Sequence, residues 1–277
     1  MGAPSSCTVA RRGVPGIVAA VLVSRLIGLL LLVALRAPAA TLTLVMDHRA
    51  ENAPLLLDSL RYGNKAGEVF SLTRASYLLS GFALQRGDGS WLEMPHAAWM
   101  DAARRRTSTV VPDAPAGRYT ALRFYVGLDA ATNTGNPAQY PPEHALNPNV
   151  NGLHWTWQSG YIFLALEGRW RRGGEPPGGF SYHFARDPNR TAITLKGDFD
   201  LAGDALAEVA FDLPRVLEGL SFAKDGTSTH AHAGDPVAAA IATNLPGAFA
   251  LKTVTSRVPE IARPSAVQPL YLPPKFT

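Results

Sequence analysis

The side chains in this sequence that could bind a transition metal are histidines, and two tryptophans lie among them. The chain holds seven histidines and a single cysteine, Cys7. Imidazole nitrogen suits copper, zinc, iron and nickel, so a metal site without thiolates has to be built on histidine, with carboxylates where they are near. His154 directly precedes Trp155, and Trp157 follows two positions later. If this segment is a strand, both indoles face one side and His154 faces the other.

Other histidines lie at positions where a strand is expected to end. His48 closes the first alternating run after residue 40, and His183 lies near the end of a short aromatic run. Both are candidate metal ligands, and a hydrogen-bonded structural role is the alternative for each. His230 and His232 are two residues apart, so in an extended segment their rings point the same way. An exposed polar loop is the alternative for this pair.

The sequence lacks the motifs of several common classes of enzyme. It has no zinc-protease helix motif, no Cys-x-x-Cys, no Gly-x-Ser-x-Gly elbow and no phosphate-binding loop with Lys-Ser/Thr. Asp198, Asp200 and Asp204 lack the glycine and glutamate positions of a calcium loop, which favours turn chemistry. The sequence therefore gives little support to a hydrolase or a nucleotide-binding protein, and we expect no enzymatic activity.

Residues 1–40 are typical of a secretory signal peptide. They carry four arginines and no acidic residue, then a ten-residue apolar run and the small residues Ala37-Pro38-Ala39-Ala40. A membrane anchor is the alternative, but Arg25 interrupts the apolar stretch. Without this leader the basic and acidic residues number 22 each, and Cys7 is lost. The mature protein is thus expected to be periplasmic, secreted or surface-associated, formally neutral and free of disulfides, with no basic stripe for nucleic acid and no membrane span.

Short alternating strands separated by Gly, Pro and Asn turns predict an all-β fold, a single antiparallel β-sandwich with long loops and one or two short helices. We expect this domain to span 41–257 and a Pro-rich tail to span 258–277, which holds five prolines. Residues 95–103 are expected to form a short helix or a loop, and 129–152 a long loop. The expected strands include 41–48, 68–84, 118–128, 180–184, 191–199 and 207–213, and the expected helices are 214–222 and 236–244.

The order of these features resembles the MbnP-like family of exported bacterial copper-binding proteins, relatives of the copper-binding proteins of methane oxidisers. The resemblance covers about residues 41–251. It rests on His48, then on Tyr77-Leu78-Leu79-Ser80-Gly81, then on Phe124-Tyr125-Val126-Gly127 entering an Asn-rich loop. Its most specific part is Leu153-His154-Trp155-Thr156-Trp157-Gln158-Ser159-Gly160-Tyr161 with Glu167-Gly168, and Phe180-Ser181-Tyr182-His183 follows.

The resemblance implies a β-sandwich that captures, stores or hands over copper. In that family histidines hold the copper together with a tryptophan oxidised to kynurenine, and the oxidation is attributed to a partner of the di-haem cytochrome c peroxidase type. Carried over, His48 and His183 become the ligands, and Trp155 or Trp157 becomes the modified side chain. This sequence departs at His154, where relatives more often have methionine, which leaves open a second site shared with His230 or His232.

Two other functions compete with copper binding. A β-sandwich adhesion or carbohydrate-binding module would present Trp155, Trp157 and Trp91 as an exposed stacking platform without a metal. A copper oxidase of the polysaccharide-cleaving type would use the mature N-terminal histidine. The predicted N-terminus is Ala40 or Thr41, which does not fit that chemistry.

Overall fold

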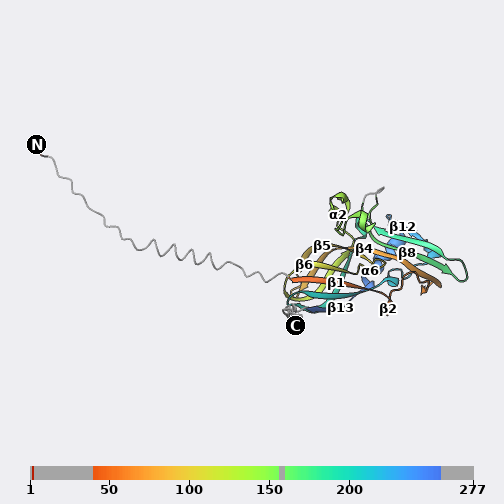
Figure 1. The fold of residues 1–277 in the computed structure, drawn as a ribbon, viewed down its shortest axis with the longest axis horizontal. Coiled ribbons are helices and arrows are strands. Elements are labelled where there is room, and N and C mark those ends of the chain that lie inside the picture. Colours follow the sequence, from red (N-terminus) through yellow and green to blue (C-terminus); the bar gives the residue numbers. More distant parts are fainter. Residues whose placement is uncertain (1, 3–39, 156–159, 257–277) are drawn as a thin grey trace, which may run out of the picture. The chain divides into compact units, whose positions relative to one another are not determined.

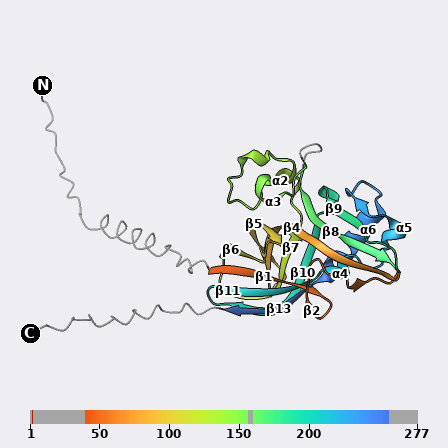
Figure 2. The same cartoon turned by 45° about the vertical axis from the view of Figure 1, so that its right-hand side comes forward.

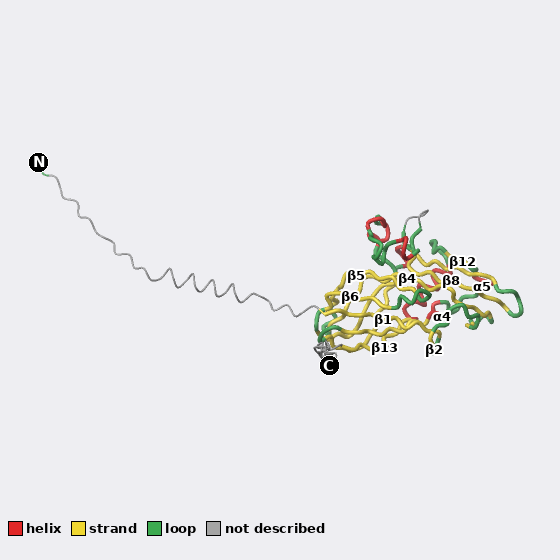
Figure 3. The backbone as a smooth tube through the Cα atoms, viewed as in Figure 1, coloured by secondary structure: helices red, strands yellow, loops and turns green. Residues whose placement is uncertain are grey.

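Two β-sheets make up most of the part of the chain that the structure describes (Figure 1). The computed structural model describes residue 2 and residues 40–155 and 160–256. Figure 3 shows that strands account for most of this part of the chain, with short helices between them. The predicted leader lies outside the described residues except for 2 and 40. The Pro-rich tail and Trp157 lie outside them entirely, so the structures expected for the leader, the tail and Trp157 stay predictions.

The smaller sheet is organised around the first strand of the domain. Its strand order is β13-β11-β1-β2, and β6 pairs with β1. β1 and β11 run parallel, with His48 opposite Phe211, whereas the other pairs in this sheet are antiparallel. The predicted antiparallel sandwich thus contains one parallel pair of strands in this sheet. The strands are β1 Ala40–Ala50, β2 Ala53–Pro54, β6 Ser108–Ala114, β11 Ala205–Asp212 and β13 Phe249–Ser256.

The larger sheet is organised around β4, a strand of 19 residues. Its order is β10-β7-β4-β8-β9-β12, and β3 and β5 also pair with β4. β12 runs parallel to β9, and the other pairs are antiparallel. The strands are β3 Tyr62–Gly63, β4 Glu68–Arg86, β5 Trp91–Asp101, β7 Gly117–Val126, β8 Ile162–Arg172, β9 Gly178–Ala185, β10 Thr191–Leu201 and β12 Ser228–Thr229.

The expectation of a helix or loop at residues 95–103 is wrong, because β5 continues to Asp101. Proline cannot donate to a strand ladder and is tolerated at bulges. Pro95 lies at such an irregularity, where the register between β4 and β5 shifts opposite Gly81. Gly81 has φ of 57°, a left-handed value that glycine adopts without strain. The bulge therefore accommodates the proline inside the strand.

Aromatic side chains fill the space between the sheets. Tyr77 of β4 contacts Phe211 of β11 edge to face, with ring centres 5.2 Å apart. Phe211 stacks on Phe249 at 3.9 Å, and Phe249 meets Phe124 of β7 at 5.5 Å. All four rings are buried. Residues far apart in sequence thus form one core, and the predicted all-β sandwich is confirmed.

Short helices fill the connections. The expected long loop at 129–152 holds α2 Ala130–Thr134, a 3-10 turn η1 Pro137–Gln139 and α3 Pro148–Asn151, and Figure 2 shows α2 and α3 side by side. Asp129, Asn136 and Asn147 cap these turns by accepting backbone N–H groups. The other helical segments are η2 Asp187–Asn189, α4 Leu213–Val216, α5 Phe222–Asp225 and α6 Pro236–Ala248.

The helix expected at 236–244 is confirmed as α6 and extends to Ala248. The helix expected at 214–222 is wrong in its extent. It is a single turn, α4, and α5 begins separately at Phe222 after Gly219, which has a positive φ of 81°. Among residues 40–155 and 160–256, every helix falls short of the length and apolar character that a bilayer span requires.

Candidate functional site

His183 lies on the outer face of the larger sheet, opposite the core. Along β9 the aromatic residues Phe180, Tyr182 and Phe184 are buried, while Ser181 and His183 alternate with them and are only partly buried. Successive strand residues point to opposite faces, so this alternation directs His183 away from the core. The same strand pattern therefore builds the core on one side and presents an imidazole on the other.

Glu167 of β8 fixes the orientation of the His183 ring. His183 Nε2 lies 3.0 Å from Glu167 Oε1 and 3.1 Å from Ser181 Oγ. The hydrogen bond from His183 lowers the pKa of Glu167 below its usual value, with a further contribution from Arg74, while burial opposes the shift. An ionised carboxylate can only accept, so Nε2 carries the proton and donates it to Glu167. In the neutral ring Nδ1 then has a lone pair, the arrangement that metal-binding histidines commonly have.

His230 lies beside His183 because β12 pairs with β9. Ser228 and Thr229 are opposite Ser181 and Tyr182 in a parallel ladder, and His230 is the next residue. The centres of the His183 and His230 rings are 5.9 Å apart, with their planes at 88°. The two imidazoles therefore come together from different parts of the chain.

The expected extended His-x-His segment is interrupted at its middle residue. Ala231 has a φ of 54°, and its backbone N–H donates to Thr229 Oγ1 at 2.9 Å. The chain thus turns between the two histidines. The rings of His230 and His232 remain neighbours, with centres 6.4 Å apart, and His232 Nδ1 accepts from Arg186 Nη2 at 3.1 Å.

Trp155 contacts both imidazoles of the pair. Its backbone N–H donates to the carbonyl of Gly160 at 3.1 Å, so the chain folds back on itself at this point. The indole centre is 6.4 Å from the centre of the His183 ring and 5.8 Å from that of His230. The residue is buried, with 8% of its surface exposed. Trp157 belongs to the undescribed stretch 156–159, so the expectation that both indoles share one face stays a prediction.

His154 has a different environment. It forms an isolated bridge with Tyr161, and its ring contacts the Tyr161 ring edge to face at 4.8 Å. Burial lowers the pKa of His154. Its aromatic contact is thus with Tyr161, whereas the indole of Trp155 packs on His183 and His230. We therefore do not place His154 in the same cluster.

His48 lies on the core side of the larger sheet. Its Nε2 is 2.9 Å from the hydroxyl of Tyr77, and its ring packs against Tyr77 and Phe211. Burial lowers the pKa of His48 to about 4, although the charges of Asp47 and Asp101 act in the opposite direction. The His48 ring, which is partly buried against the core, is therefore neutral at neutral pH.

The register of the larger sheet separates His48 from His183. Ser76, Ala165 and His183 lie opposite one another across β4, β8 and β9, so they share one face. Tyr77, the neighbour of Ser76, points to the other face, where it meets His48. The expectation that His48 and His183 converge on one metal is corrected by this placement. The physical reason is the two-residue period of β4 and β9.

The His183–His230 pair has a spacing that one metal ion could bridge. Imidazole nitrogen binds a first-row metal at about 2 Å and lies about 1 Å from the ring centre, so two rings on one ion have centres about 5 to 6 Å apart. The observed 5.9 Å falls within this range. Within residues 40–155 and 160–256, no group of three or more His, Cys, Asp or Glu side chains could hold a metal ion.

The chain is similar to known proteins in sequence and in fold. The family model for MbnP matches residues 39–232. The chain belongs to the MbnP family. A solved structure with a similar fold is MbnP from Methylosinus trichosporium, with a TM-score of 0.52 and 17% sequence identity. That alignment covers 74% of this chain and 88% of the other. The search of curated proteins found no match.

Sequence reasoning identified part of this cluster and missed part of it. His183, Trp155 and Glu167 all lie in motifs that resemble the MbnP-like family, and the structure brings these three side chains together. His230 was recognised only as half of a His-x-His pair. Arg186, which bonds to His232 and to the carbonyl of His230, carried no recognisable signal in the sequence.

Proposed function

We propose that this MbnP-family protein is an exported, non-enzymatic copper-binding protein that captures, stores or hands over copper at His183 and His230. The observation that carries the proposal is the meeting of the two imidazoles at 5.9 Å, with Trp155 against both rings. The family resemblance supports histidine ligands and a neighbouring tryptophan. The ligand pair differs from the one expected from sequence, because His230 replaces His48.

The chemistry of the donors favours copper. The one cysteine, Cys7, lies in the predicted leader, so the exported chain would supply nitrogen and oxygen ligands but no thiolate. Copper(II) has the highest affinity of the divalent first-row metals for such sites. Glu167 supports the assignment because it would hold the His183 proton on Nε2 and so keep Nδ1 open to the metal.

Trp155 is our candidate for oxidation to kynurenine. An indole N–H is a donor only and cannot ligate a metal, whereas kynurenine offers an aniline nitrogen and a ketone oxygen with lone pairs. The oxidation adds two oxygen atoms, supplied by two water molecules, across the C2–C3 bond of the indole and breaks it, with release of four protons and four electrons. Hydrolysis then removes the formyl group as formate. A di-haem peroxidase-type partner would accept the four electrons, with two molecules of peroxide reduced to water balancing them.

Copper titration of the purified full chain tests the ligand assignment. Single His183→Ala and His230→Ala variants are expected to weaken copper binding at least about tenfold each, because each removes one of two imidazole donors. His144→Ala is the matched control, since His144 stacks on Tyr140 in another part of the fold. Unchanged affinity in both ligand variants would refute the site.

An adhesion or carbohydrate-binding module has less support. That function needs exposed, coplanar tryptophans, but Trp155 is 8% exposed and packs against histidines. Trp91 lies under the guanidinium of Arg123 at 4.5 Å. These contacts occupy the indole faces that a sugar ring would need, so copper binding remains the function that the described geometry supports best.

A further inference from the structure

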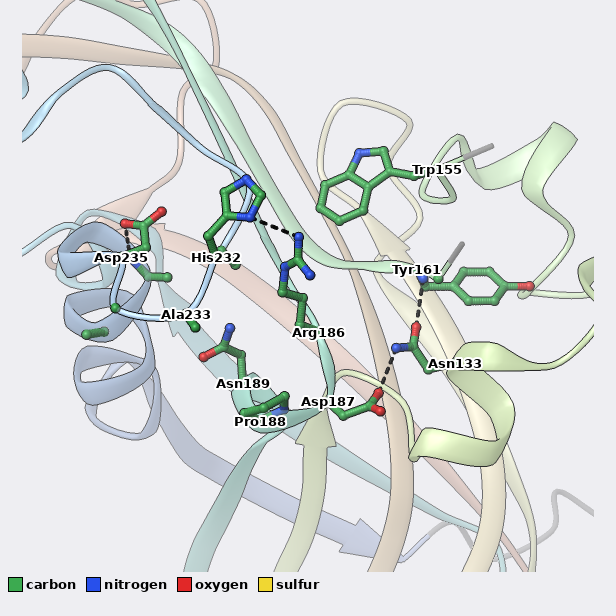
Figure 4. Close-up of a pocket in the computed structure, with 15 residues that line it drawn as sticks. Asn133, Trp155, Tyr161, Arg186, Asp187, Pro188, Asn189, His232, Ala233 and Asp235 are labelled. Carbon is green, nitrogen blue, oxygen red and sulfur yellow. Dashed lines mark hydrogen bonds between the residues drawn. The ribbon is translucent and has the colours of Figure 1, made fainter. Parts of the chain in front are cut away.

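A cavity of about 600 Å³ lies next to the His183–His230 pair. Figure 4 shows its lining, with Trp155 on one side, His232 on another and Arg186 between them. The volume is within the range of small-molecule sites, which are mostly apolar with a few polar groups that fix the ligand's orientation. This cavity has that composition.

Arg186 supplies the positive charge at the cavity. Its Nε donates to the carbonyl of His230 at 3.3 Å and its Nη2 to Nδ1 of His232 at 3.1 Å. Both acceptors are uncharged, and the two bonds fix the position of the guanidinium. These bonds hold the planar guanidinium at the wall, where it could face a ligand with its fork of N–H donors.

The backbone at Arg186 is in a conformation that favours glycine. Its φ is 77° and its ψ is 145°, where a side chain with a Cβ is strained. Such strain persists only where the surrounding structure holds it, and it is often found at ligand-binding positions. A glycine would fit the turn with less strain. The surrounding structure therefore holds Arg186 in this conformation at the cavity wall.

His232 adds a second donor. The guanidinium can only donate, so Nδ1 of His232 is the acceptor in their hydrogen bond. In the neutral ring the proton is therefore on Nε2, which makes that atom a donor.

The two carboxylates at the cavity already have structural roles. Asp235 accepts the N–H groups of Val237 and Ala238 at the start of α6 and also bonds the hydroxyl of Thr229. Asp187 accepts from Asn133 Nδ2 at 2.7 Å, and Asn133 in turn accepts from the backbone N–H of Tyr161. Asp187 and Asp235 therefore both hold together the chain segments that line the cavity.

The remaining wall is apolar. Trp155 forms one side, and Ala233, Ala238 and Ala239 form part of the other. An inorganic ion would leave these apolar side chains exposed to water, whereas an organic ligand would bury them. Arginine pairs with planar carboxylates through two parallel hydrogen bonds. We propose that this cavity binds a small organic carboxylate, its carboxylate on Arg186 and its apolar body against Trp155 and the alanines of α6.

Calorimetric titration of the metal-free full chain with two probes of the same ring tests this inference. Indole-3-acetate carries a carboxylate, and tryptamine carries an ammonium group. The carboxylate is expected to bind at least about tenfold more tightly than the amine, because it forms charge-assisted bonds with Arg186. Equal binding of the two probes, or no binding of the carboxylate, would overturn the proposal, and so would inorganic phosphate binding as tightly.

Variants locate the binding site. Arg186→Gln should weaken indole-3-acetate binding about tenfold or more, while Arg118→Gln, at an arginine that is 90% exposed on its side chain, should leave it unchanged. Ala239→Phe should block the cavity without removing the guanidinium, which guards against a folding defect in the Arg186 variant. Unchanged binding in both cavity variants would contradict the assignment. Because the protein is metal-free, a failure here leaves the copper titration unaffected, and the reverse also holds.

Discussion

The imidazole of His230 stands edge to face against that of His183, with ring centres 5.9 Å apart. The parallel pairing of β12 with β9 creates this contact, because it brings the segment that precedes α6 to the outer edge of the larger sheet. Trp155, which precedes β8 in the chain, packs its indole against both imidazoles. Three segments that are distant in sequence therefore define the proposed copper site.

Glu167→Gln should weaken copper binding by about tenfold or more, in the range found for carboxylates behind metal-binding histidines. The amide keeps the size of the side chain but removes the charge that orients His183 Nε2–H and that pairs with Arg74 at 2.9 Å. Competition titration measures the change. Glu175→Gln in the exposed turn after β8 is the control, and an equal effect of the two variants would contradict the role of Glu167.

His48→Gln should reduce the dependence of stability on pH without weakening copper binding. The folded pKa of His48 is about 4, against 6.5 for an unperturbed ring. The unfolded chain therefore binds more protons between pH 6.5 and 4. The contribution of His48 to the free energy of unfolding is fully present above pH 6.5. It falls as the pH drops towards 4, by up to about 3 kcal/mol.

Urea unfolding at pH 7 and pH 5 measures this effect. The wild-type protein should lose more unfolding free energy between the two values than His48→Gln, in which the amide can still bond the Tyr77 hydroxyl. Carboxylates affect both proteins alike, so the difference isolates the histidine. Identical pH dependence would show that His48 is not a buried neutral ring, and a loss of copper affinity would restore it as a ligand.

The positions of the two predicted ligands follow from strand phase, a signal that the sequence contains. His48 has the same phase as the buried Leu42, Leu44 and Met46 along β1, which directs it to the core. His183 is out of phase with the buried Phe180, Tyr182 and Phe184 along β9, which directs it outward. Comparing the two phases predicts that the rings lie on opposite sides of a sheet.

The place of His230 could not be predicted in the same way. β12 has only two residues, so it shows no periodicity that distinguishes a strand from a loop. Its parallel pairing with β9 depends on the surrounding tertiary structure rather than on local preference. The overall β-sandwich and α6 were predictable, because their alternation and capping signals are local. The left-handed turns at Arg186 and Ala231 have no glycine to mark them.

Glu68→Ala should destabilise the fold by about 3 kcal/mol or more, because it leaves buried donors without an acceptor. Glu68 is fully buried in β4 and accepts from the backbone N–H groups of Phe222 and Ala223 and from Ser221 Oγ. It also pairs with Arg172 at 2.9 Å. These bonds attach the start of α5 to the larger sheet.

Chemical denaturation measures the loss of stability. Glu218→Ala is the control, since Glu218 forms an exposed ion pair with Lys65, and such pairs contribute at most about 1 kcal/mol. Similar unfolding free energies for the two variants would mean that the Glu68 network does not stabilise α5.

Trp155→Phe should abolish the mass gain expected from kynurenine formation. Oxidation of one tryptophan to kynurenine, with loss of the formyl group, raises the mass by about 4 Da. Protein isolated from its native host should carry this increment, whereas the Trp155→Phe protein should have the mass of its unmodified sequence. Trp170→Phe is the matched control, because Trp170 stacks on Phe222 elsewhere on the larger sheet. Intact-mass spectrometry distinguishes the three proteins. An increment that persists in Trp155→Phe would assign the modification to another tryptophan, and an unmodified wild-type mass would remove kynurenine from the proposed site.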